Sequence, residues 1–183
     1  MGELRAWLLA KLLWDPARDD AGLIREFLRG YYGPAADPIQ SYLDVMHGAA
    51  RRAGFYASYK YHPWAGGHSY GPPAQADARL VAFPAVQEAW EHLKKAEAAV
   101  KDDPALLGRV QATQLPLMYL YLSRWKELKA KADQEKIAWP LPASAGEVAR
   151  RFAAIAATNG LESIGQKGGM LESIAGIAEA ADR

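Results

Sequence analysis

The apolar positions of residues 3–14 surround almost the whole circumference of the helix that this stretch is predicted to form. Its Leu, Ala, Trp, Arg and Lys residues favour helix, and only two basic residues interrupt the apolar surface. A helix that is apolar on nearly all sides needs partners on two faces. We expect the second face to be covered by a larger protein or by self-association. The aromatic cluster of Trp14, Tyr31 and Tyr32 has helical spacing, and we expect it to pack in the core.

Amphipathic helical periodicity continues along most of the chain. It predicts further helices over residues 21–32, 35–53, 84–101, 103–132, 144–158 and 170–181. Pro116 predicts a kink in the longest of these, which we take as the central helix. Ser144 and Glu147 match a capping box at the start of the next one. No repeat or interdomain linker interrupts the pattern. We therefore predict an all-α protein with a single helical domain over residues 1–183, an irregular bundle of six or seven helices.

The segment 55–82 breaks this pattern, because it mixes aromatic residues with glycine and proline. We predict an ordered loop that is longer than most connections in compact domains. A saccharide site needs flat aromatic rings beside hydrogen-bonding side chains, and this loop supplies both. The candidate ligand-binding residues are Tyr59, Tyr61, His62, Trp64, His68 and Tyr70. In the alternative interpretation, Tyr61 and Trp64 fold back onto the bundle and anchor the loop.

Composition and charge argue against several classes of function. The formal net charge of +1 gives no electrostatic reason to expect nucleic acid or an anionic membrane as a partner. The chain has no cysteine, which excludes disulfides and Cys-based metal sites. No apolar run approaches the ~20 residues that span a bilayer, and the N-terminal run lacks the features of a signal peptide. We expect a soluble protein and assign no compartment.

The sequence contains no convincing catalytic or metal-binding constellation. Glycoside cleavage needs two carboxylates held about 5 to 9 Å apart. The candidate pairs are Glu88 with Glu91 and Asp102 with Asp103, and we interpret them as solvent-facing and helix-capping residues. Two of the histidines each have one carboxylate a helical turn away, which is too few ligands for a metal. We therefore predict no metal site and no cofactor, assign no catalytic residue, and leave enzymatic activity open.

Several motifs resemble the DUF4838 family. The resemblance is carried by residues 3–16 (ELRAWLLAKLLWDP), 23–27 (LIREF) and 30–36 (GYYGPAA), by Ile39, Tyr42 and Leu43, and more loosely by Ala89, Ala96, Glu97, Arg109, Val110, residues 115–117, Phe152, Asn159 and Gly160. It covers nearly the whole chain. It implies the C-terminal helical region of glycoside-hydrolase-like proteins, which are similar in layout to α-glucuronidases. In such proteins a (β/α)8 barrel precedes this region and is expected to hold the catalytic carboxylates.

This resemblance implies a helical accessory domain as the leading function. The domain would support the upstream barrel, with the first helix at the junction of barrel and bundle. It would also bring the aromatic loop near the substrate and contribute contacts between two copies. The alternative is an independent saccharide-binding or protein-interaction module that dimerises through the stretch from Glu3 to Trp14. A free-standing hydrolase ranks third, because the chain has no predicted barrel strands.

Overall fold

The computed structural model describes residues 1–52, 82–161 and 170–182, which contain helices and no strands. This confirms the predicted all-α class. The α-helices are α1 (Gly2–Trp14), α2 (Asp20–Tyr32), α3 (Ala36–Arg52), α4 (Phe83–Ala99), α5 (Pro104–Ser123), α6 (Trp125–Glu135), α7 (Ala145–Thr158) and α8 (Met170–Asp182), with a 3-10 helix, η1 (Gly33–Ala35), between α2 and α3. Most of them begin and end within two residues of the positions that the periodicity predicts.

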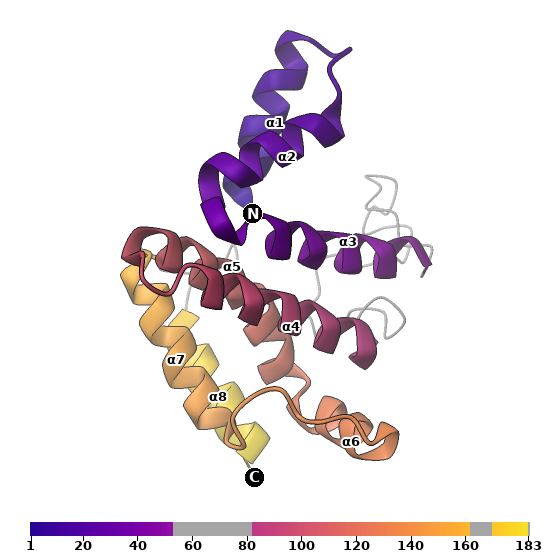
Figure 1. The fold of residues 1–183 in the computed structure, drawn as a ribbon. Coiled ribbons are helices and arrows are strands. Elements are labelled where there is room, and N and C mark those ends of the chain that lie inside the picture. Colours follow the sequence, from indigo (N-terminus) through magenta and orange to yellow (C-terminus); the bar gives the residue numbers. More distant parts are fainter. Residues whose placement is uncertain (53–81, 162–169, 183) are drawn as a thin grey trace, which may run out of the picture.

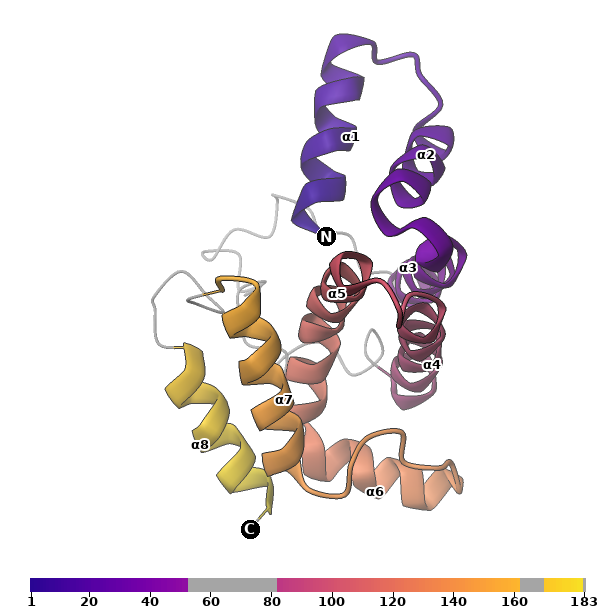
Figure 2. The same ribbon diagram turned by 60° about the vertical axis from the view of Figure 1, so that its left-hand side comes forward.

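Helices α1 and α2 form an arm that projects from the rest of the molecule (Figures 1 and 2). Below this arm, α3 packs along α4, and α5 lies between α4 and α7. Helix α8 packs on α7 and also contacts α5, while α6 runs across the far end of the bundle. The buried core surrounds α5, which is therefore the central helix, as its two apolar stripes predict.

The single long helix predicted over residues 103–132 is two helices. Helix α5 continues through Pro116, which is exposed, and ends at Ser123. The backbone leaves the helical conformation at Arg124, with φ −122° and ψ 25°, before α6 begins. The side chain of Arg124 is buried, and its Nε donates a hydrogen bond of 2.8 Å to Glu127 Oε2 in the first turn of α6. This charge-assisted hydrogen bond stabilises the corner between the two helices.

The N-terminus of α7 is capped by Asp182, the last residue of α8. Ser144 makes no side-chain capping bond within its own helix, so the predicted capping box does not form. Instead, the carboxylate of Asp182 accepts hydrogen bonds from the backbone N–H groups of Ala145 (2.9 Å) and Gly146 (3.1 Å). Those hydrogen bonds lower the pKa of Asp182. A carboxylate is favoured at the positive end of a helix, so this contact ties α8 to α7.

The corner between α2 and α3 requires the glycine of the motif over residues 30–36. Gly33 has a φ of +53°, which glycine adopts at little cost. A Cβ atom at this position would also lie only 3.1 Å from Leu106 Cδ1 on α5. Ala35 and Ala36, which follow it, are buried. The motif therefore has a structural role: it turns the chain from the arm into the bundle.

We predict that Gly33→Ala lowers the free energy of unfolding by about 1–3 kcal/mol, because alanine is strained at positive φ. Gly30→Ala is the matched control, since Gly30 lies in α2 with open space around it. It should leave stability unchanged or raise it by about 0.5–1 kcal/mol. Urea denaturation, compared at the midpoint with an unchanged m-value, measures both effects. Equal midpoints for the two variants would contradict this role of Gly33.

Candidate functional site

A row of aromatic rings holds α1 on α2. The ring of Trp7 lies 5.6 Å from that of Phe27, which stacks on Tyr31 at 5.0 Å between centroids. A cation lies over each end of this row: Lys11 Nζ is 5.2 Å from the Trp7 ring, and the Arg109 guanidinium is 4.5 Å from the Tyr31 ring. Such cation–π contacts are attractive. The row runs from α1 across α2 to α5.

Two tyrosines at the end of α2 fasten the arm to α5. The hydroxyl of Tyr32 lies 2.9 Å from Thr113 Oγ1, and both residues are buried. Arg109 Nη1 donates a hydrogen bond of 2.7 Å to the carbonyl oxygen of Tyr31. Burial raises the pKa of Tyr32 to about 12, so its hydroxyl remains protonated at neutral pH. Tyr32 packs in the core, as predicted, whereas Tyr31 is only partly buried and packs against the core.

The described residues leave the opposite face of α1 exposed. Leu9 and Leu13 on this face are 52% and 82% exposed, and Trp14, which lies on the Trp7 side at the end of α1, is 92% exposed. These exposures agree with the prediction that the rest of the chain does not cover both faces of this helix. The prediction that Trp14 packs in the core is wrong. Trp14 is the last residue of α1, and α1 extends beyond the start of α2, so none of the described helices lies beside its end (Figure 2).

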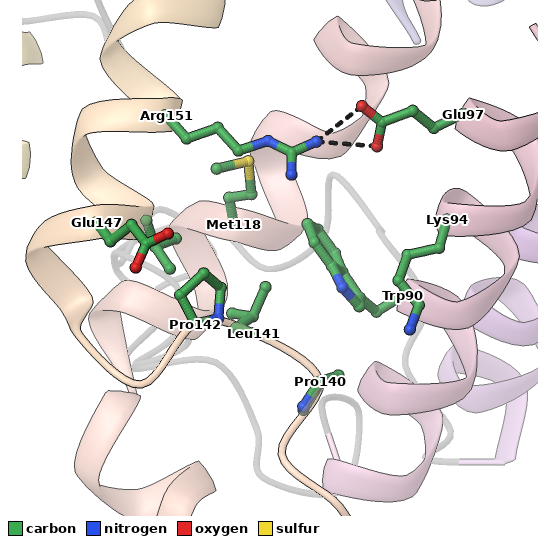
Figure 3. Close-up of a pocket in the computed structure, with 10 residues that line it drawn as sticks. Trp90, Lys94, Glu97, Met118, Pro140, Leu141, Pro142, Glu147 and Arg151 are labelled. Atoms are coloured by element: carbon green, nitrogen blue, oxygen red, sulfur yellow. Dashed lines mark hydrogen bonds and ion pairs between the residues drawn. The ribbon is translucent and has the colours of Figure 1, made fainter. Parts of the chain in front are cut away.

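A small pocket lies between α4, α5, α7 and the connector from α6 to α7 (Figure 3). Its volume is about 230 Å³, below the ~300–1,000 Å³ of sites for drug-sized ligands. The lining combines apolar and charged side chains: Trp90, Met118, Pro140, Leu141, Pro142 and Val148 with Lys94, Glu97, Glu147 and Arg151. Such a pocket has room for one small ring.

The connector that closes this pocket is anchored by Trp139. Its ring stacks on Phe83 at 6.3 Å and meets Tyr121 and Trp125 edge-on at 5.5 and 5.0 Å. The indole Nε1 donates a hydrogen bond of 3.2 Å to the carbonyl oxygen of Pro142. The connector therefore has a fixed place against the core, although it is not helical.

Two of the lining residues, Glu97 and Arg151, belong to a hydrogen-bonded cluster with Gln111 and Gln114, which we call the Glu97 cluster. Glu97 accepts hydrogen bonds from Gln111 Nε2 (3.1 Å) and Gln114 Nε2 (2.8 Å). Arg151 Nη2 lies 2.9 Å from both carboxylate oxygens, reaching across from α7 (Figure 3). It also donates to the fully buried Gln114 (3.1 Å), so the cluster joins α4, α5 and α7.

The Glu97 cluster keeps its carboxylate ionised. Burial by itself would raise the pKa of Glu97, but the hydrogen bonds from Gln114 and Gln111 and the charge of Arg151 outweigh it and lower the pKa. A general acid needs a raised pKa, so Glu97 is unsuited to that role. We interpret the cluster as a clamp between three helices.

The sequence-predicted candidates have three different outcomes. Tyr59, Tyr61, His62, Trp64, His68 and Tyr70 lie outside the described residues, so their ligand role stays a prediction. Asp103 accepts hydrogen bonds of 3.0 Å from the N–H groups of Ala105 and Leu106 and caps α5, as interpreted. Glu91 forms a surface ion pair of 2.9 Å with Lys94. Within the described part of the chain, no three potential metal ligands gather.

Sequence reasoning missed the pocket and the Glu97 cluster. Their residues come from four segments between positions 90 and 151, and no local motif links them. One signal was available, because Gln114 is a polar residue among the apolar positions of α5. None of the described helices combines the length and the apolar character that crossing a membrane requires.

We predict that Glu97→Gln lowers the free energy of unfolding at pH 7 by about 1–3 kcal/mol, because hydrogen bonds to a charged group are lost. Because folding lowers the pKa of Glu97, its ionised carboxylate stabilises the fold at pH values above 4.5, the ordinary pKa of glutamate. This stabilisation disappears as the pH falls through the lower folded pKa. The difference in the free energy of unfolding between wild type and variant should therefore disappear as the pH is lowered. Urea denaturation at several pH values measures it.

The control for this prediction is Glu91→Gln, which removes an ion pair on the exposed surface. It should change stability by less than ~1 kcal/mol at any pH. If the stability difference between wild type and Glu97→Gln did not depend on pH, the ionised carboxylate would not hold the three helices together as we interpret it.

Comparison with known protein families places part of the chain beside one of them. No curated protein and no solved structure matches the chain. Residues 1–44 match DUF4838, described as a domain of unknown function. The matched residues comprise the arm, the Gly33 corner and the first half of α3. This confirms the resemblance of the opening motifs, whereas the looser stretches after residue 44 lie outside the match. The N-terminal part of this chain is therefore similar to the DUF4838 family.

Proposed function

We propose that this chain is a helical accessory domain of a glycoside-hydrolase-like protein, and that it acts by docking the outer face of α1 on another protein surface. The observation that carries the proposal is the exposure of Leu9, Leu13 and Trp14 on one helix. Contiguous exposed apolar side chains on a folded protein are typical of interaction sites. We assign no catalytic residue to this chain.

The way in which the arm is held supports this proposal. A docking surface works best when its shape exists before the partner binds, since less entropy is then lost on association. The aromatic row and the contacts of Tyr31 and Tyr32 with α5 hold α1 in one position. The match to DUF4838, over residues 1–44, includes this arm. The partner that the family resemblance favours is a (β/α)8 barrel.

A second candidate function uses the same exposed face. In it, the chain is an independent interaction module that pairs with itself through α1. The exposure of Leu13 and Trp14 favours it equally. A role in binding saccharide depends on the aromatic loop and stays a prediction.

The accessory-domain proposal predicts a barrel domain encoded in the reading frame upstream of Met1. When expressed as a separate polypeptide, that barrel should capture this chain. Leu13→Lys should abolish capture, because it places a charge in the contact. It should change the free energy of unfolding by no more than about 0.5 kcal/mol, since Leu13 is 82% exposed. Pull-down and thermal melting measure the two effects.

Leu161→Lys is the matched control, because Leu161 is an exposed leucine (43%) that follows α7 and is not part of the arm. This variant should be captured like the wild type. The proposal fails if no barrel is encoded beside this chain, or if Leu13→Lys leaves capture unchanged.

A further inference from the structure

The pocket between α4, α5 and α7 has an apolar interior. Trp90, Met118 and Val148 line it, and each of these three residues is buried. The connector adds Leu141 and two prolines, which have no backbone N–H group. Because Trp139 holds the connector against the core, the shape of the pocket exists before a ligand enters. Such an interior favours an apolar ring as part of the ligand.

Three of the four charged residues that line the pocket are already balanced by partners. Arg151 Nη2 lies 2.9 Å from both carboxylate oxygens of Glu97. Lys94 Nζ lies 2.9 Å from Oε1 of Glu91, which is on the same helix. These two ion pairs contribute no net charge to the pocket, so they favour neither an anionic nor a cationic ligand.

The fourth charged residue, Glu147, is not balanced. It makes no hydrogen bond or ion pair with the residues that the structure describes. Glu147 lies four residues before Arg151 on α7, a spacing at which glutamate and arginine pair on one helix face. Arg151 reaches across to Glu97 on α4 instead, and Glu147 lies on the side of the pocket opposite Trp90 (Figure 3). The apolar pocket therefore has one uncompensated negative charge at its edge.

We propose that this pocket binds a small organic cation, in which a primary ammonium group is attached to one apolar ring. The ring occupies the apolar interior beside Trp90, Met118 and Leu141. The ammonium group lies against the carboxylate of Glu147, to which it donates a charge-assisted hydrogen bond. A neutral molecule of the same shape lacks this ionic contact, and an anion is repelled by it. The site is separate from α1 and does not depend on the proposed docking role.

The size of the pocket and the exposure of Glu147 determine how tightly such a cation binds. The volume of about 230 Å³ limits the apolar contact to one small ring. Because Glu147 is exposed, water screens its charge, and an ion pair of this kind changes an affinity by only a few-fold. We therefore expect a dissociation constant of about 1 mM for a single-ring amine.

The test is an NMR titration of the full isotope-labelled chain with benzylammonium, benzyl alcohol and benzoate, which share one ring and differ in charge. Benzylammonium should shift the indole N–H signal of Trp90 and the amide signal of Val148 in a saturable manner. Benzyl alcohol should bind at least about threefold more weakly, because it lacks the ionic contact, and benzoate more weakly still.

Glu147→Gln removes the charge and keeps the length of the side chain. This variant should bind benzylammonium at least about threefold more weakly and bind benzyl alcohol to within about twofold of the wild type. Glu135→Gln is the matched control, because Glu135 is an exposed glutamate on α6 that does not line the pocket, and it should leave both affinities unchanged. Thermal melting establishes that both variants are folded, as expected for exposed positions.

The proposal is overturned if benzylammonium causes no saturable shift at Trp90 and Val148, or if the three probes bind equally well. It is also overturned if Glu147→Gln binds benzylammonium as tightly as the wild type does. None of these outcomes concerns the outer face of α1. Leu13→Lys should bind benzylammonium like the wild type, so failure of the docking role and failure of this site are measured separately.

Discussion

The hydrogen bond between Tyr32 and Thr113 fixes the direction in which the arm leaves the bundle. It connects the last turn of α2 to the central helix α5, and the Arg109 contact with Tyr31 reinforces it one residue away. They act together with the packing of α2 against α3 and with the corner at Gly33. The exposed face of α1 therefore has a defined orientation because a few polar atoms at its base are buried and paired.

Polar contacts between distant residues also hold the remaining helices. Glu97 and Gln114 connect α4 to α5, and Arg151 brings α7 to both. Apolar side chains alone tolerate many similar packings, whereas buried polar groups must each find a partner. The Glu97 cluster thus favours one arrangement of three helices over its alternatives, and the small pocket is the space that this arrangement leaves beside the connector.

Sequence periodicity predicts most of the helices because each one buries a stripe of its own residues. It does not predict the break at Arg124 or the cap of α7 by Asp182, because both depend on where a polar side chain finds a partner in the folded chain. The uncovered face of α1 was predictable, since residues 3–14 carry more apolar surface than one neighbour covers. The exposure of Trp14 was not, because it depends on where α2 begins relative to α1.

The contact of Asp182 with the first turn of α7 has a consequence for how the C-terminal hairpin moves. Packed helices shift past each other by small slides or in ratchets of one turn, about 5.4 Å. Any such step would carry the carboxylate away from Ala145 and Gly146, to which its hydrogen bonds are 2.9 and 3.1 Å long. The Asp182 contact therefore favours the present register of α7 and α8 over one shifted by a turn.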